Sequence, residues 1–102
     1  MAMAQPAQLE GKALIDALKK GGSVLSIRHA ATDMTVGDKD QVAISDCSTQ
    51  RNLSAQGRMH VRTMGSAFDL RQIPVGQVLS APYCRTMETA RLAFARADAP
   101  RL

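Results

Sequence analysis

The sequence predicts an α/β fold of three layers (α-β-α), with helices on both faces of a mainly parallel sheet. Aromatic residues make up 3% of the 102 residues and Trp is absent, so a core of aliphatic side chains is expected, which suits helices packed on a sheet. Strand-like runs alternate with helical patterns, and a strand–helix–strand order with a long connection favours a right-handed parallel crossover. A chain of this length has room for one domain.

Three helices are expected where apolar residues recur at helical spacing. The first covers residues 8–20 and stops at Gly21-Gly22. The second begins after Ser54, a suitable N-cap, and runs to about Leu70. The third follows Pro82 and places four residues on one face: Tyr83, Met87, Ala90 and Phe94.

Two short apolar runs, residues 23–28 and 77–80, have the length and composition of strands. Between them, residues 30–51 show no lasting period, and a loop of this length is more often functional than idle. Parallel strands end on the same sheet edge, where open α/β sheets bind ligands. The segments 28–33 and 80–85 are therefore expected to be neighbours.

The charge of the chain suits a phosphorylated ligand. The formal net charge is +4, and nine of the thirteen basic residues are Arg, whose planar fork matches phosphate oxygens. The basic residues are scattered and no aromatic residues lie between them, so nucleic acid is not an expected partner. No apolar run approaches the roughly 20 residues that span a bilayer.

The first eight residues, MAMAQPAQ, are open to two interpretations. Ala2-Met3-Ala4 has the small-x-small form of a signal-peptidase site, although no charged segment or apolar region precedes it. Residues 1–8 are thus either a signal-peptide remnant or a disordered terminus, and residues 9–102 form the domain. The first interpretation places the protein in the periplasm or outside the cell; the second leaves the cytoplasm open.

Three residues are candidates for phosphate chemistry. A neutral imidazole such as that of His29, held at a strand end, is a competent nucleophile. The neighbouring Arg28 can stabilise charge on a transferring phosphoryl group. Arg85 lies in the first turn of the third helix, where the backbone N–H groups favour an anion. The alternatives are that His29 is structural and that Arg85 is solvated or pairs with Glu88.

The segment from Arg51 to Arg58 opens the middle helix. Most of it is explained by N-capping, with Gly57 allowing the helix to lie close to the sheet. Arg51 is expected at the same edge as His29, within reach of a substrate.

Three segments together resemble the phosphoglycerate-mutase-like histidine phosphatases. These proteins carry Arg-His-Gly after the first strand, then Arg-x-Leu-Thr/Ser-x-x-Gly, then Ser-Ser-Pro-x-x-Arg-x-x-x-Thr-Ala. The resemblance covers residues 23–94, and the matching segments occur in the same order: Arg28-His29-Ala30, Arg51-Asn52-Leu53-Ser54-Ala55-Gln56-Gly57 and Ser80-Ala81-Pro82-Tyr83-Cys84-Arg85-Thr86-Met87-Glu88-Thr89-Ala90.

The resemblance implies a phosphomonoester or phosphoprotein hydrolase, or a mutase, that needs no metal or other cofactor. His29 would accept the phosphoryl group while Arg28 and Arg85 hold its oxygens, and Thr32 would also contact the phosphate. The implied partner is a small phosphorylated substrate or a phosphoprotein; the oligomeric state stays open. Ala30 replaces the usual Gly, a change that is tolerated where φ is negative.

The family also uses an acidic proton donor and a second histidine from later in the chain. This chain supplies neither: His60 lies inside the middle helix as a surface or packing residue, and Glu88 stands where the family has no acid. The sequence therefore predicts the N-terminal half of a truncated domain with impaired activity. The alternative is a non-catalytic member that only binds phosphate or other anions.

Cys47 lies in the long loop and Cys84 beside Arg85. A bridge between them would close a loop of 37 residues and stabilise the fold by ~3–4 kcal/mol on the chain-entropy estimate. Two free thiols, the usual state in the cytosol, are the alternative. Together with Ala2-Met3-Ala4, a bridge favours an oxidising compartment. No metal site is expected, because the Cys and His residues lack ligand spacing.

Overall fold

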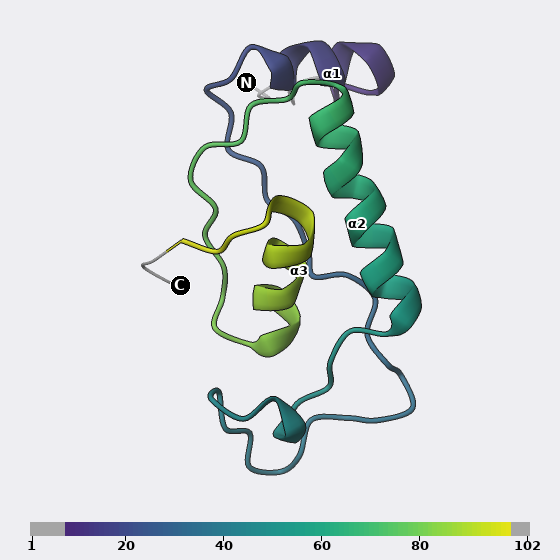
Figure 1. Cartoon of the computed structure of the whole chain (residues 1–102), viewed down its shortest axis with the longest axis vertical. Coiled ribbons are helices and arrows are strands. Elements are labelled where there is room, and N and C mark those ends of the chain that lie inside the picture. Colours follow the sequence, from purple (N-terminus) through teal and green to yellow (C-terminus); the bar gives the residue numbers. More distant parts are fainter. Residues whose placement is uncertain (1–7, 99–102) are drawn as a thin grey trace, which may run out of the picture.

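The computed structural model describes residues 8–98 (Figure 1). It has three α-helices, α1 (Gly11–Lys19), α2 (Ala55–Leu70) and α3 (Cys84–Phe94), and a short 3-10 helix, η1 (Cys47–Thr49). Residues 1–7, which carry the expected signal-peptide remnant or disordered terminus, lie outside the described residues. Within the described part, no helix is both long and apolar enough to cross a membrane.

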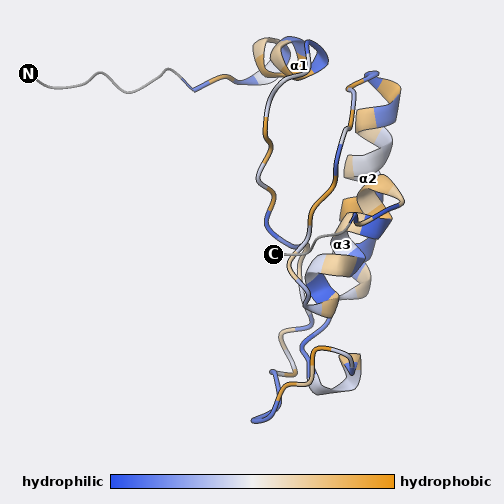
Figure 2. Cartoon of the chain, turned by 90° about the vertical axis from the view of Figure 1, so that its left-hand side faces the viewer, coloured by the Kyte–Doolittle hydropathy of each residue, from blue (hydrophilic) through white to orange (hydrophobic). Residues whose placement is uncertain are grey.

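The predicted sheet does not form, and the α-β-α prediction is wrong. Residues 8–98 contain no strand, only two isolated bridges, Thr32 with Leu53 and Leu79 with Asp98. Residues 23–28 make no backbone hydrogen bond to any other described residue, and Val24 is 98% exposed. Both apolar runs lie in segments without helix that link the helices (Figure 2). An apolar run predicts an extended backbone, but a sheet also needs a partner in register.

The helix predictions are confirmed, with small changes at the ends. Ser54 is the N-cap of α2, and its side chain accepts a hydrogen bond from the Gly57 N–H at 3.0 Å. α3 begins one residue after its N-cap Tyr83. α1 is shorter than residues 8–20 and has no buried residue.

The core lies where α2 and α3 pack together. Phe68 and Phe94 meet edge to face with ring centroids 5.2 Å apart. Gly65 lies so close to the backbone of Ala93 that a Cβ would collide with its carbonyl. The buried apolar side chains of the described residues are Leu53, Val61, Ile73, Val78, Met87 and Ala90.

Candidate functional site

The residues that follow His29 run beside the start of α2. The N–H of Asp33 donates to the carbonyl of Asn52 at 2.9 Å, and the N–H of Ser54 donates to the carbonyl of Ala31 at 3.0 Å. These two hydrogen bonds join residues some twenty positions apart. They give the chain after His29 a defined position on α2.

Gly57 makes this approach possible. A Cβ at Gly57 would collide with the backbone of Ala31, including its carbonyl oxygen. The predicted role of Gly57 in close packing is thus seen here, although the neighbour is the segment after His29 and not a sheet.

The imidazole of His29 is half-buried, and its Nδ1 lies 2.8 Å from the carbonyl oxygen of Ala30. A carbonyl oxygen only accepts, so this contact is a hydrogen bond when Nδ1 carries the hydrogen. In the neutral ring, Nε2 then holds the lone pair. This is the nitrogen that can attack an electrophile.

α3 meets the same segment through Thr89. The Thr89 Oγ1 accepts a hydrogen bond from the Ala30 N–H at 3.0 Å and donates to the Arg85 carbonyl at 2.7 Å. The structure therefore brings the segment after His29 against α3, but the contact is made by Thr89, outside the expected neighbour segment 80–85, and without a sheet edge.

The Arg85 guanidinium forms an ion pair with a carboxylate. Its Nη1 and Nη2 lie 3.0 and 3.4 Å from the two carboxylate oxygens of Asp38, and Nη1 also donates to the Arg51 carbonyl at 3.3 Å. Only 16% of the Arg85 side chain is exposed, and its guanidinium carbon lies 4.5 Å from the centre of the Tyr83 ring. Arg85 thus does not pair with Glu88, which pairs instead with Arg58.

Asp38 belongs to the long loop and has two donors. The backbone N–H of Arg51 donates to its carboxylate at 2.8 Å, and this bond, followed by the one from Arg85, lowers the pKa of Asp38 from its ordinary value of 3.8. Its carboxylate is therefore charged at neutral pH. It is the anion that Arg85 holds in this structure.

Gln50 ties the loop to the start of α3, a role that the sequence analysis missed. Its buried side-chain amide donates to the carbonyls of Ala43 and Ile44, at 3.0 and 3.3 Å, and its Oε1 accepts the Cys84 N–H at 2.8 Å. That N–H belongs to the first residue of α3, so Gln50 satisfies a donor at the helix start. A glutamine in a polar loop has no sequence pattern that marks it as buried.

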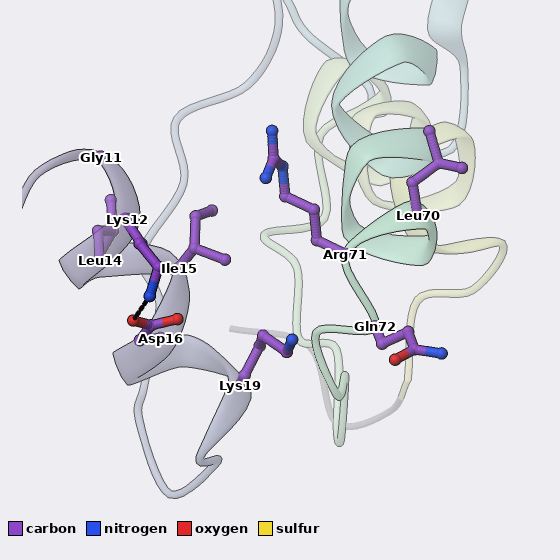
Figure 3. A pocket seen from close by; sticks show the side chains of 9 residues that line it. All are labelled: Gly11, Lys12, Leu14, Ile15, Asp16, Lys19, Leu70, Arg71 and Gln72. Atoms are coloured by element: carbon purple, nitrogen blue, oxygen red, sulfur yellow. Dashed lines mark hydrogen bonds and ion pairs between the residues drawn. The ribbon is translucent and has the colours of Figure 1, made fainter.

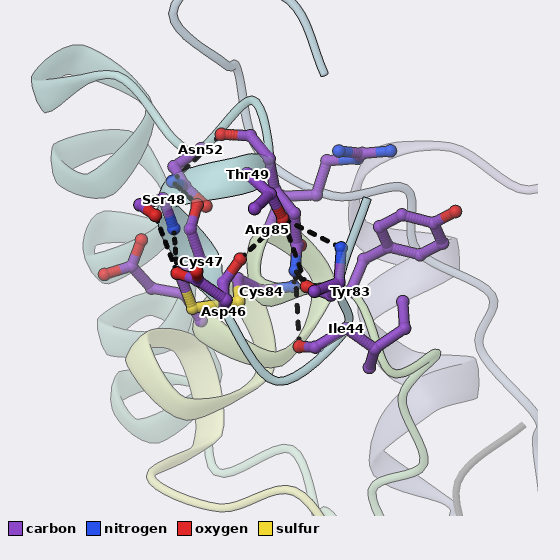
Figure 4. The surroundings of a disulfide bond; sticks show 12 residues. Ile44, Asp46, Cys47, Ser48, Thr49, Asn52, Tyr83, Cys84 and Arg85 are labelled. Atoms are coloured by element: carbon purple, nitrogen blue, oxygen red, sulfur yellow. Dashed lines mark hydrogen bonds between the residues drawn. A yellow bond between two sulfur atoms is a disulfide. The ribbon is translucent and has the colours of Figure 1, made fainter. Parts of the chain in front are cut away.

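A disulfide joins Cys47, the first residue of η1, to Cys84, the first residue of α3 (Figure 4). Asp46, which precedes it, caps η1 by accepting hydrogen bonds from the backbone and side chain of Ser48. The bridge and Gln50 together hold the long loop over the start of α3, directly beside Arg85.

The side chains of the other predicted site residues differ in exposure and in their partners. Arg28 is exposed. The Arg51 Nε is buried and has no hydrogen-bond partner among the described residues. Thr32 is buried, and its hydroxyl contacts the Met34 sulfur at 3.7 Å. His60 is exposed on α2, so of its two expected positions, surface or packing, the structure shows the surface one.

A separate open cleft of about 780 Å³ lies between α1 and the end of α2 (Figure 3). Lys12, Lys19 and Arg71 are among its lining residues, and Lys12 is already bonded to Asp16 at 2.8 Å. None of the predicted site residues lines this cleft, so it is not part of the candidate phosphate site.

Comparison with known proteins identifies the family to which the chain belongs. The model of the histidine phosphatase superfamily (branch 1) matches residues 24–101, which is more than half of the chain. The chain therefore belongs to the histidine phosphatase superfamily, for which phosphatase- or mutase-type activity on phosphorylated small molecules is indicated. No curated protein and no solved structure matches it.

Proposed function

We propose that this protein is a phosphomonoester or phosphoprotein hydrolase that acts through a phosphohistidine on His29. The observation that carries the proposal is the contact between His29 Nδ1 and the Ala30 carbonyl. It leaves Nε2 of the neutral ring as the free nucleophile. Membership of the superfamily supports the same reaction class.

In the proposed first step, the His29 Nε2 lone pair forms a bond to phosphorus while the ester P–O bond breaks. The leaving oxygen carries away the electron pair and takes a proton from solvent. In the second step, water attacks the phosphorus, the P–N bond breaks and inorganic phosphate is released. The imidazole is then regenerated.

Arg85 is the proposed principal clamp for the phosphoryl oxygens. Its terminal nitrogens already face two oxygens of one anion, the Asp38 carboxylate, and a phosphoryl group presents oxygens to the same fork. A bound phosphate would share Arg85 with Asp38 or displace it. Arg28, Thr32 and Arg51 are proposed as additional substrate-binding residues.

Turnover is proposed to be impaired. The other histidine of the chain, His60, is exposed on α2, and Glu88 is bound to Arg58, so neither is set up to protonate a leaving oxygen. Substrates with stable leaving anions need no such proton. We therefore expect p-nitrophenyl phosphate to phosphorylate His29 much faster than an alkyl phosphate does.

Brief exposure to p-nitrophenyl phosphate labelled at phosphorus tests the proposal. The expected result is acid-labile, base-stable phosphate on the wild type and on His60→Ala, and none on His29→Ala. Equal label on His29→Ala would refute the assignment of the nucleophile. Inorganic phosphate binding without any label on the wild type would instead identify a non-catalytic protein that only binds anions.

An oxidising location, the periplasm or the cell exterior, is part of the proposal. The Cys47–Cys84 disulfide supports it, because such bridges persist where thiols are not kept reduced. Fractionation of cells that express the protein, with a thiol count on the denatured, non-reduced protein, tests this. Two reactive thiols in the periplasmic fraction would contradict it.

A further inference from the structure

Thr89 connects the two parts of the proposed phosphate site. It lies in α3 one helical turn after Arg85, and only 7% of the residue is exposed. Its hydroxyl oxygen accepts the Ala30 N–H and donates to the Arg85 carbonyl. Within residues 8–98, this is the one hydrogen bond between residues 28–33 and α3.

The chemistry of the hydroxyl suits this position. A threonine in a helix commonly donates its hydroxyl hydrogen to the carbonyl four residues earlier, which here is that of Arg85. With the hydrogen committed, the oxygen lone pairs remain to accept from Ala30. A valine would fill nearly the same space but leave the half-buried Ala30 N–H without this partner, which is costly.

We propose that Thr89 is a positioning residue for phosphoryl transfer, setting the distance and orientation of His29 relative to Arg85. The proposal rests on the function proposed above for His29. Ala30 directly follows His29 in the sequence, and its carbonyl oxygen accepts a hydrogen bond from the His29 Nδ1. A shift of Ala30 therefore moves the imidazole. The Arg85 guanidinium has its own contacts with Asp38 and Arg51, and Thr89 takes part in neither of them.

Loss of the Thr89 hydroxyl should therefore lower the rate of phosphoryl transfer to His29 while leaving phosphate binding at Arg85 nearly unchanged. Thr89→Val should slow phosphohistidine formation from p-nitrophenyl phosphate by about 10–100-fold, because small misplacements of reacting groups are that costly. Inorganic phosphate, for which Arg85 is the proposed principal clamp, should inhibit with a constant close to the wild-type value. Thr89→Ser, which keeps the hydroxyl, should restore most of the rate.

Thr63→Val is the matched control. Thr63 is exposed on α2 and its hydroxyl donates to the Met59 carbonyl of its own helix, at 3.1 Å. It should react like the wild type. If Thr89→Val does not fold, Thr89→Ala removes the same hydroxyl without a new methyl contact. A wild-type rate for Thr89→Val, failure of Thr89→Ser to restore the rate, or a parallel loss of phosphate inhibition would each overturn the proposal.

Amide hydrogen exchange at Ala30, followed by NMR, tests the contact without relying on activity. Exchange should be faster in Thr89→Val than in the wild type, and near wild type in Thr89→Ser. Unchanged exchange in Thr89→Val overturns the positioning role. If exchange responds as expected but the wild type never acquires phosphate on His29, the proposed function fails, and Thr89 then positions Ala30 without a part in phosphoryl transfer.

Discussion

α1 and the pair formed by α2 and α3 are held in different ways. α1 has no buried residue, and Leu14 on its apolar stripe remains 38% exposed. α2 and α3 each bury three residues and pack against one another. An amphipathic pattern indicates where a helix lies in the sequence, but most helical stability comes from packing against other parts of the chain, and α1 has little of that packing.

Two further segments are fixed to the α2–α3 pair by specific contacts. The segment after His29 is fixed to α2 by backbone hydrogen bonds and to α3 by Thr89. The long loop is fixed to α3 by Gln50 and the disulfide. The candidate phosphate site thus lies between segments that are cross-linked to α2 and α3, and such support favours defined placement of reacting groups.

Removing the disulfide should cause the largest loss of stability among the changes that test this difference between α1 and the α2–α3 pair. The bridge spans 37 residues, and the chain-entropy estimate gives a loss of about 3–4 kcal/mol in the free energy of unfolding. The double variant Cys47→Ser/Cys84→Ser should therefore unfold at lower denaturant concentration than the oxidised wild type. Chemical denaturation followed by circular dichroism measures the difference.

A reducing agent provides the control. It should destabilise the wild type to about the level of the double variant and leave the double variant unchanged. Equal stability of the oxidised and reduced wild type would show that the loop is held without the bridge. The fixed position of the long loop would then depend on Gln50 and the other hydrogen bonds of the loop alone.

Substituting the two contact glycines of α2 should have the next largest effect. A Cβ at Gly57 would collide with the Ala31 backbone, and one at Gly65 with the Ala93 backbone. Either Gly→Ala change is expected to cost about 1–3 kcal/mol, as for overpacking in a core, despite the higher helix propensity of Ala. Thermal unfolding of each variant measures this cost.

Gly37→Ala and Gly76→Ala are suitable controls, since a Cβ at either position meets nothing within 4 Å. They should leave stability nearly unchanged. A stable Gly57→Ala protein would mean that α2 does not depend on close contact with the segment after His29, which would weaken the contrast between the two regions.

The sequence predicted the helices and several members of the candidate site. Apolar periodicity and the cap at Ser54 are local features, so α2 could be placed almost to the residue. The wrong prediction of a sheet has a physical reason: residues 23–28 have strand composition, but pairing depends on a second segment that composition does not specify.

Asp38 and Gln50 could not have been predicted as neighbours of Arg85. Both lie in a loop without periodicity, and their contacts join residues 34 to 47 positions apart. Thr89 was visible within the motif that contains Arg85, but no pattern assigned it a role. Its function as a link emerged only from the two hydrogen bonds of its hydroxyl.

The smallest effect is expected in α1, at the ion pair between Lys12 and Asp16. The two groups are 2.8 Å apart, but 89% of the Lys12 side chain and 51% of the Asp16 side chain are exposed. Solvent screens such a pair, so Lys12→Gln should change the free energy of unfolding by less than about 0.5 kcal/mol. Chemical denaturation, with Lys39→Gln in the exposed loop as a reference, measures the change. A loss above about 1 kcal/mol would show that α1 is coupled to the α2–α3 pair, since an isolated exposed pair does not contribute that much.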